Sequence, residues 1–353
     1  MRIVIVGGGI AGVSAAAALA PYGKVTLLEA ETALGYHASG RSAALFVENY
    51  GNEVIQTLNR TTRPGLETRK VLSERGLMLI ALPEETERFS ESIAEMEMRE
   101  ISLEEARAKI PILSSDIQRA AFTNKVLDID TDLLIQGCAK EARAGDAEVR
   151  TGAKVTAIAH KNFWMVSVGE EVIEADILIN AAGAWADEVA SMAGVCPMGL
   201  VPYRRSVARM PVPGGYDAKN WPMIFGPGET WWAKPDAGAW IVSPAEEDPS
   251  EPMDAWADDM VLAEGIARYE PHVSEPVTRV DTNWAGLRTF AHDRTLVIGE
   301  AADAPGFFWL AGQGGYGFQT SLAAAAVLAH HVVGSDAGVD AKTVAALHPA
   351  RFE

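Results

Sequence analysis

The chain has 353 residues, a length typical of about two domains. Its 48% hydrophobic and 22% charged residues are typical of a packed globular protein. Its 30 basic against 48 acidic residues give a net charge of −18, which would repel a phosphate backbone and argues against nucleic-acid binding. Two cysteines, Cys138 and Cys196, are too few for a disulfide framework, and we expect a cytoplasmic protein. We expect no membrane span, while peripheral association with a membrane stays open.

The first 28 residues predict a strand–turn–helix–strand unit. Residues 3–6 form a short apolar, β-branched run, residues 13–19 an alanine-rich helix, and residues 24–28 a second strand. A basic residue followed by an apolar stretch is also typical of a signal peptide. Four glycines interrupt this stretch, so we expect the segment to be part of the folded protein.

Gly7, Gly9 and Gly12 of this unit match the dinucleotide-binding pattern G-x-G-x-x-G. The first glycine makes the tight turn, the second lets the backbone approach a pyrophosphate, and the third lets helix and strand pack closely. Free N–H groups and the dipole at the helix start favour phosphates. Glu29 follows the second strand, where a carboxylate accepts hydrogen bonds from an adenosine ribose. The unit therefore predicts a nucleotide-binding domain.

The rest of the chain predicts that nucleotide-binding elements occupy both ends and an antiparallel sheet lies mostly between them. Proline and glycine divide residues 200–242 into short alternating strands. Ser102, three residues before Glu105, predicts the start of a short helix. Other helices are expected at residues 41–62, 131–143, 254–269 and about 318–333, and other strands at residues 76–82, 155–159, 164–168, 176–180, 295–299 and 307–311.

Two features favour FAD over a nicotinamide cofactor. A second glycine-rich turn, residues 312–317, again joins a strand to a helix. A flavin benefits from a helix N-terminus near its N1–C2=O edge, where negative charge collects on reduction. The other feature is a turn of small residues, 39–44, after the second strand. The alternative interpretation is that these two loops are unrelated.

Several segments resemble the D-amino-acid oxidase family of flavoproteins, which includes glycine and sarcosine oxidases. The resemblance covers nearly the whole chain, and two segments, PYRRS and KPDAG, are most similar to the branch that contains bacterial D-arginine dehydrogenase. The segments are VIVGGGIAG at 4–12, GYHASGRSAA at 35–44, NAAGAW at 180–185, PYRRS at 202–206, KPDAG at 234–238, WAGLR at 284–288 and GFFWLAGQGGYGFQTS at 306–321.

The resemblance implies an α/β (α+β) fold with a Rossmann-like FAD-binding domain of the glutathione-reductase type and a substrate domain built on a mainly antiparallel sheet. Residues 1–75, 145–198 and 291–353 are expected in the FAD domain, and residues 76–144 and 199–290 in the substrate domain. The implied reaction is hydride transfer from the Cα of an amino acid to flavin N5. Water then hydrolyses the imine to a 2-oxo acid and ammonia.

The same resemblance places Arg288 and Arg205 at the substrate carboxylate, in agreement with the bidentate fit of guanidinium and carboxylate groups. Tyr50 is implied over the substrate side chain. The carbonyl of Gly315 would face the amine, and Gln319 would line the pocket. The implied FAD contacts are Gly7, Gly9, Ile10, Ala11, Gly12, Glu29, Ala30, Ser39, Gly40, Arg41, Ser42, Ala43, Val155, Ala182, Gly183, Trp185, Gly312, Gln313, Gly314, Gly315, Tyr316 and Gly317.

Three positions depart from the arginine-using branch. Trp232 stands where the relative has a tyrosine, Leu77 where it has a carboxylate, and Leu45 where it has a histidine. These changes make the pocket more apolar, so we expect apolar D-amino acids as substrates. No cysteine follows residue 196, so we expect FAD to be bound without a covalent link. We expect no metal site.

Other functions stay open from the sequence. A relative of this class would oxidise glycine, sarcosine, another secondary amine or a 2-hydroxy acid. A protein of a different class would be a flavin-binding sensor or partner module without catalysis. The electron acceptor is also open: oxygen, a quinone or another carrier.

Overall fold

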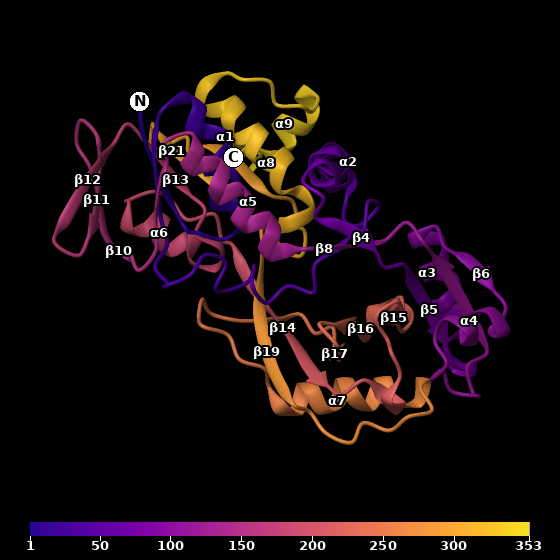
Figure 1. Cartoon of the computed structure of the whole chain (residues 1–353). Coiled ribbons are helices and arrows are strands. Elements are labelled where there is room, and N and C mark those ends of the chain that lie inside the picture. The colour runs from indigo at the N-terminus through magenta and orange to yellow at the C-terminus, as the bar shows by residue number, and fades with distance from the viewer. Residues whose placement is uncertain (353) are drawn as a thin grey trace.

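The computed structural model describes residues 1–352, which form two lobes with both chain ends in the larger one (Figure 1). The N-terminal unit folds as predicted, with α1 (Ile10–Leu19) between β1 (Arg2–Val6) and β2 (Lys24–Leu28). These strands are central in a six-stranded sheet of order β20–β21–β13–β1–β2–β9. All its neighbours pair in parallel except β20 and β21. The other strands are β9 (Glu148–Arg150), β13 (Ile177–Asn180), β20 (Val297–Glu300) and β21 (Phe307–Ala311).

Helices cover this sheet. α1 packs against both α5 (Thr131–Ala144) and α8 (Gly317–Val333), and α8 packs against α2 (Glu53–Thr68). The sequence analysis placed α5 with the substrate domain. In the structure Leu134 and Cys138 are fully buried in the same core as α1, because apolar residues at helical spacing form one stripe on α5. We therefore draw the boundary near residue 130.

The smaller lobe is built on a nine-stranded sheet whose neighbours are antiparallel except β5 and β15. Its path is β18–β14–β17–β16–β15–β5–β7–β6, and β19 pairs with β14. Figure 1 shows β14 and β19 running from one lobe into the other. The elements are β5 (Leu77–Ala81), β6 (Arg99–Ile101), β7 (Arg119–Thr123), β14 (Val201–Met210), β15 (Met223–Phe225), β16 (Trp232–Asp236), β17 (Ala239–Ser243), β18 (Asp248–Pro249), β19 (Thr282–Phe290), α3 (Thr86–Met96), α4 (Leu103–Lys109) and α7 (Asp259–Tyr269).

Two small sheets and two short helices complete the fold. The predicted hairpin of residues 155–168 forms and gains a third strand. Residues 41–52, expected to be helical, instead form a loop with a two-residue strand, because the Asn52 side chain accepts a hydrogen bond from Ile55 N and caps α2 there. The elements are β10 (Val155–His160), β11 (Trp164–Val168), β12 (Glu171–Ala175), β3 (Leu45–Phe46), β4 (Leu72–Glu74), β8 (Leu127–Ile129), α6 (Ala186–Met192) and α9 (Ala341–Leu347).

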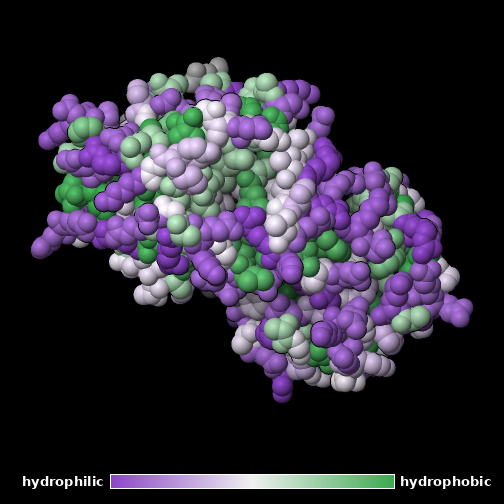
Figure 2. Space-filling view, turned by 45° about the horizontal axis from the view of Figure 1, so that its top comes forward, coloured by the Kyte–Doolittle hydropathy of each residue, from purple (hydrophilic) through white to green (hydrophobic). Residues whose placement is uncertain are grey.

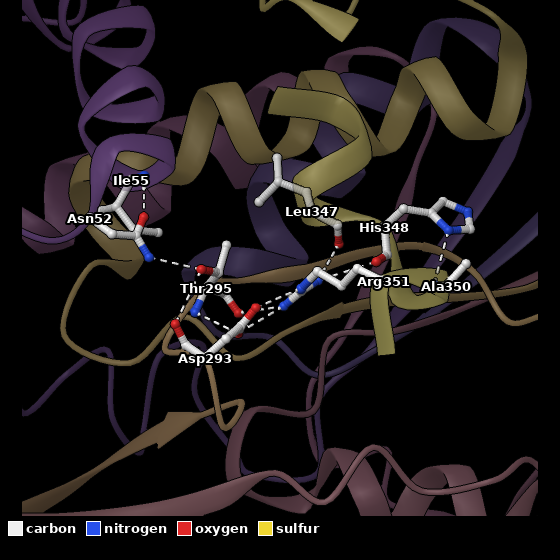
Figure 3. Close-up of polar contacts among 8 residues, drawn as sticks. All are labelled: Asn52, Ile55, Asp293, Thr295, Leu347, His348, Ala350 and Arg351. Carbon is white, nitrogen blue, oxygen red and sulfur yellow. Dashed lines mark hydrogen bonds and ion pairs between the residues drawn. The ribbon is translucent and has the colours of Figure 1, made fainter. Parts of the chain in front are cut away.

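The C-terminal segment is joined to the start of α2 by a chain of polar contacts (Figure 3). Arg351 Nε donates to Asp293 Oδ2 at 2.8 Å, and Thr295 N donates to Asp293 Oδ1 at 3.0 Å. The Thr295 hydroxyl accepts from Asn52 Nδ2 at 2.8 Å, and Asn52 in turn caps α2. The contacts hold the loop after β19 beside the segment that carries Tyr50.

Hydrophilic residues cover most of the face in Figure 2, on both lobes, in keeping with the net charge of −18. Among residues 1–352, no helix is both long and apolar enough to cross a membrane.

Candidate active site

A cavity of about 750 Å³ extends from the carboxyl ends of β1 and β2 to one face of the nine-stranded sheet. Residues of both lobes line it. A crevice at the carboxyl ends of parallel strands is where α/β folds bind nucleotides. The cavity therefore joins a nucleotide-binding position to a second compartment in the smaller lobe.

The glycine turn after β1 is packed too closely for side chains. Gly7 has φ +109°, and a Cβ on it would lie 2.4 Å from Ala181 O. A Cβ on Gly12 would lie 1.8 Å from Gly7 O, so this glycine allows helix and strand to meet, as the sequence predicts. Gly9 is the N-cap of α1 and makes no side-chain cap, and the first turn has no acidic residue. This end of α1 presents N–H groups and positive partial charge to the cavity, which fits a pyrophosphate.

Glu29 is 8% exposed at the end of β2. Its carboxylate accepts a hydrogen bond from Gly8 N at 2.7 Å and another from Glu31 N at 2.8 Å. Each carboxylate oxygen keeps capacity for a second donor, as a ribose hydroxyl pair would require. Ser39 Oγ accepts from Ile10 N at 3.0 Å and so joins the loop of residues 39–44 to α1.

Most of the residues expected at FAD line the cavity, and four do not. Three of these four are glycines that shape the backbone. Gly12 packs against Gly7, and Gly40 N donates a hydrogen bond to Gly35 O at 2.6 Å. Gly312 has φ +74° in the turn after β21. Tyr316 has its ring 5.8 Å from that of Phe290. The other expected contacts, all in the lining, are Gly7, Gly9, Ile10, Ala11, Glu29, Ala30, Ser39, Arg41, Ser42, Ala43, Val155, Ala182, Gly183, Trp185, Gln313, Gly314, Gly315 and Gly317.

Strand register brings the two predicted arginines together. Tyr203 on β14 lies opposite Arg288 on β19. Residues directly opposite in antiparallel strands point to the same face, and so do residues two apart in one strand. Arg205 therefore shares that face with Arg288, and both line the cavity.

The two arginines differ in their partners. Arg205 Nη2 pairs with Glu247 Oε1 at 3.1 Å, and Glu247 also pairs with Arg294 at 2.8 Å. Burial, and then the charge of Arg288, lower the pKa of Arg205 to about 10, so it stays charged at neutral pH. Arg288 forms no ion pair within residues 1–352. A Cβ on Gly315 would lie 3.2 Å from its guanidinium carbon, so the missing side chain at Gly315 leaves room for Arg288.

Tyr50 and Gln319 lie in the same lining. Burial raises the pKa of the Tyr50 hydroxyl, whose ring meets that of Tyr316 edge-on at 5.5 Å. Gln319 is 3% exposed, and its Oε1 accepts from Val47 N at 3.1 Å. Its Nε2 is buried without a partner in the part of the chain described, so the cavity side of this amide has a donor available for a bound molecule.

The side-chain compartment is mainly apolar. Leu77 lies beside Met223, and Phe225 lies opposite Trp232, so alternate residues of three strands form one wall. Leu45 also lines the cavity, so all three positions expected to make the pocket apolar, Leu45, Leu77 and Trp232, lie in it. Glu48, an acid close to Tyr50 in sequence, pairs with Arg63 at 3.0 Å and does not line the cavity.

Sequence reasoning missed Glu229, which lines the same compartment from the turn between β15 and β16. In an acidic chain, a glutamate at a turn is typical of a solvated surface, so the residue pattern gave no reason to single it out. Its position two residues before the pair Trp231 and Trp232, in the turn between two mainly buried strands, is the signal that distinguishes it.

The fold and cavity define a dinucleotide-binding flavoprotein with a separate substrate compartment. The family model described as FAD-dependent oxidoreductase (DAO) matches residues 2–331, and the chain belongs to this family. FAD is its cofactor. The glycine turn, the exposed N–H groups of α1 and Glu29 are the groups that fit it.

Solved structures of this fold match 94–99% of the chain at low sequence identity. Glycine oxidase from Geobacillus kaustophilus is 19% identical, with a TM-score of 0.83 over 99% of each chain. L-proline dehydrogenase from P. horikoshii is 22% identical, with a TM-score of 0.81 over 99% of this chain and 97% of that one. L-α-glycerophosphate oxidase from Mycoplasma pneumoniae, determined with FAD bound, is 19% identical, with a TM-score of 0.80 over 94% of each chain.

Among curated proteins, the anaerobic glycerol-3-phosphate dehydrogenase subunit A1 of Haloferax volcanii is 28% identical over 227 residues. The match covers 55% of this chain and 38% of that subunit. The chain therefore matches well under half the length of this relative.

Proposed function

We propose that the protein oxidises a D-amino acid with an apolar side chain to a 2-oxo acid and ammonia. The observation that carries this proposal is Arg288, which lines the cavity beside Arg205 without an anionic partner, next to an apolar wall. The D configuration is supported by the resemblance of residues 202–206 and 234–238 to the D-arginine-using branch.

Binding would fix the substrate at two points. The carboxylate would lie on Arg288 and Arg205, since planar guanidinium groups bind carboxylates through paired hydrogen bonds. The apolar side chain would lie against Leu77, Phe225 and Trp232 with Tyr50 over it, and each buried methylene contributes about 0.8 kcal/mol. Two fixed ends orient the Cα–H bond, which is how positioning accelerates such a step.

Bound FAD supplies the acceptor for the hydride equivalent that leaves Cα. The chain's own groups would hold the amine. The carbonyl oxygen of Gly315 would accept a hydrogen bond from one amine N–H, and the Gln319 amide lines the same cavity. When the hydride departs with the electron pair of the Cα–H bond, the lone pair of the neutral amine forms the C=N bond. Loss of one N–H proton to water gives the imine, which water hydrolyses to the 2-oxo acid and ammonia. No side chain is needed as a base if the amine is neutral when the hydride leaves.

Other substrates and a non-catalytic role are the competing proposals. The structural relatives include a glycine oxidase, an L-proline dehydrogenase and an L-α-glycerophosphate oxidase, so glycine, L-proline and glycerophosphate are the alternative substrates. A flavin-binding sensor would need the same cofactor cradle but would have no use for a carboxylate clamp, and the unpaired Arg288 favours an enzyme.

The test is a substrate panel without oxygen. Purified protein is mixed with the D- and L-forms of methionine, leucine, phenylalanine, lysine and arginine, and with glycine, sarcosine, L-proline, a 2-hydroxy acid and glycerol 3-phosphate. Bleaching of the flavin and release of 2-oxo acid are measured. We expect the apolar D-amino acids to react fastest. Fastest reaction with glycerol 3-phosphate or L-proline would overturn the proposal.

A further inference from the structure

The substrate compartment contains a further ionisable side chain, Glu229, that the proposed function has not used. In the part of the cavity walled by the nine-stranded sheet, Arg288 and Glu229 are ionisable and have no ion-pair partner within residues 1–352, whereas Arg205 is paired with Glu247. Two groups of opposite charge type that lack partners and line one cavity are both available to a ligand that carries a carboxylate and a cation.

The turn between β15 and β16 fixes the position of Glu229. Gly226 N donates to Trp231 O at 3.1 Å, and Glu229 N donates back to Gly226 O at 3.1 Å. Gly228 N donates to Ser92 Oγ at 3.2 Å, which attaches the turn to α3. Glu229 has φ +52°, a left-handed conformation that residues other than glycine rarely adopt. Strained residues held by surrounding contacts are concentrated at functional sites.

Glu229 is an exposed residue that lines the cavity. Loss of hydration at this position raises the pKa of its carboxyl. The charges of Arg288 and Arg205 act in the opposite direction on the same group. Apart from burial, the charge of Glu229 is the largest influence raising the pKa of the Tyr50 hydroxyl. Glu229 thus lies in the compartment formed by the two arginines and Tyr50.

We propose that Glu229 is a specificity-determining residue that selects substrates carrying an ammonium group beside the carboxylate bound by Arg288. This inference rests on the proposed function and narrows its substrate class. A zwitterionic amino acid presents one charge to each unpaired side chain. A 2-hydroxy acid or a glycerol phosphate presents only negative charge, so it leaves Glu229 without a partner and is repelled by it. The cation that Glu229 selects is therefore the α-ammonium group, which lies beside the carboxylate in every amino acid.

The first test compares Glu229→Gln with wild type and with Glu264→Gln, a matched change on the exposed surface of α7. The specificity constants are measured for D-leucine, D-lysine and the D-form of 2-hydroxy-4-methylpentanoate, which has the leucine side chain without nitrogen. We expect Glu229→Gln to lower the ratio of amino acid to hydroxy acid by on the order of 30-fold or more, and Glu264→Gln to leave it unchanged. Equal losses for D-leucine and D-lysine are expected, because both carry the α-ammonium group, and a loss for D-lysine alone overturns the inference. An unchanged ratio for both amino acids overturns the inference.

The second test needs no turnover. 4-Methylpentanoate has the carboxylate and the apolar side chain of leucine but no ammonium group, and its binding is followed by the change in flavin absorbance. Glu229→Gln should bind it about tenfold more tightly than wild type, because a repelling charge is removed, while Glu229→Asp should bind it as weakly as wild type. Equal affinity of wild type and Glu229→Gln would overturn the inference. Failure of the proposed function has a different signature: none of the amino acids tested would bleach the flavin of the wild-type protein.

Discussion

Arg288 is available to a ligand because its neighbours neither pair with it nor crowd it. Glu247 is engaged by Arg205 and Arg294, and Gly315 has no side chain to occupy the space beside the guanidinium. At the residue scale, the proposed chemistry therefore depends on Arg288, which is held in a fixed place and has no ion-pair partner within residues 1–352.

Replacing Arg288 should disable substrate binding without loss of the cofactor. Arg288→Met keeps an unbranched aliphatic stem but removes the guanidinium group and its charge, and losing one partner of a buried charge pair costs about 2–5 kcal/mol. We expect the specificity constant for the best amino acid to fall at least about 30-fold with unchanged FAD content. Arg279→Met, on an exposed arginine paired with Asp281, is the control and should behave as wild type. Near-normal turnover of Arg288→Met would place the carboxylate site elsewhere.

Replacing Glu29 should weaken FAD binding and lower stability together. In Glu29→Ala, Gly8 N and Glu31 N lose their charged acceptor, and a ribose would lose its own. A hydrogen bond to a charged group contributes roughly 1.5–3 kcal/mol. The flavin-to-protein ratio after gel filtration and the Tm measure the two effects. Glu29→Gln should be intermediate, and a Glu29→Ala protein with full flavin and unchanged Tm would contradict the assignment.

The sequence predicted some site residues better than others for physical reasons. The glycine turn and Glu29 lie in one short unit, where spacing alone constrains geometry. Arg205 and Arg288 were expected from the family resemblance, and strand pairing explains why they meet. Glu229 depends on the conformation of a turn with two consecutive left-handed residues, Gly228 and Glu229, which the residue pattern does not encode.

At the element scale, successive side chains along each strand of the nine-stranded sheet point alternately to the cavity and to the hydrophobic core. On β15, Phe225 lines the cavity while its neighbour Ile224 is fully buried in the core on the other face. On β14, Val207 faces the cavity while Ala208 faces the same core. A one-residue shift of register would move the arginines of β14 and β19 out of the site.

Element boundaries were the least predictable part of the fold. α7 begins at Asp259 rather than at residue 254, because the Asp258 side chain accepts from Met260 N and Val261 N and caps the helix there. The assignment of α5 to the FAD domain depends on contacts distant in sequence, which periodicity does not reveal. Long periodic helices, such as α8, were predicted closely.

The end of α8 should make stability depend on pH. Burial, and then the charges of His348 and His330, lower the pKa of His331 from 6.5 to about 4. Above pH 6.5 the residue is neutral in folded and unfolded chains. As the pH falls from about 6.5 toward 4, the unfolded chain takes up a proton that the folded chain does not, so stability decreases.

The measurement is the Tm between pH 7.5 and 4.5. His331→Gln should show a shallower fall in Tm across this range than wild type. His160→Gln, a change on an exposed histidine, should keep the wild-type slope. Identical slopes for wild type and His331→Gln would show that other groups govern the pH dependence.

At the scale of the whole molecule, polar contacts join the two lobes around the cavity. Arg41 Nη1 donates to Ala285 O at 3.0 Å, and Lys234 Nζ reaches both Ala43 O and Asp128 Oδ1. These contacts hold the loop of residues 39–44 between the FAD cradle and the nine-stranded sheet. The sequence indicated that both chain ends belong to one domain, and the parallel pairing of β1, β13 and β21 provides the reason.

FAD should be released intact when the protein unfolds. Neither Cys138 nor Cys196 lines the cavity, so no thiol is placed to attach to the flavin. After acid precipitation, we expect all the yellow colour in the supernatant. Colour that stays with the pellet after washing in denaturant would mean a covalent link.

The most direct test of the central claim is anaerobic reduction of the flavin by one enantiomeric pair. Wild-type protein is mixed with D-methionine or L-methionine, and the flavin absorbance is followed with time. The account predicts rapid, complete bleaching by D-methionine, little by the L-form, and a loss of the D-methionine reaction in Arg288→Met. Bleaching by neither enantiomer, or equal bleaching of wild type and Arg288→Met, would contradict it.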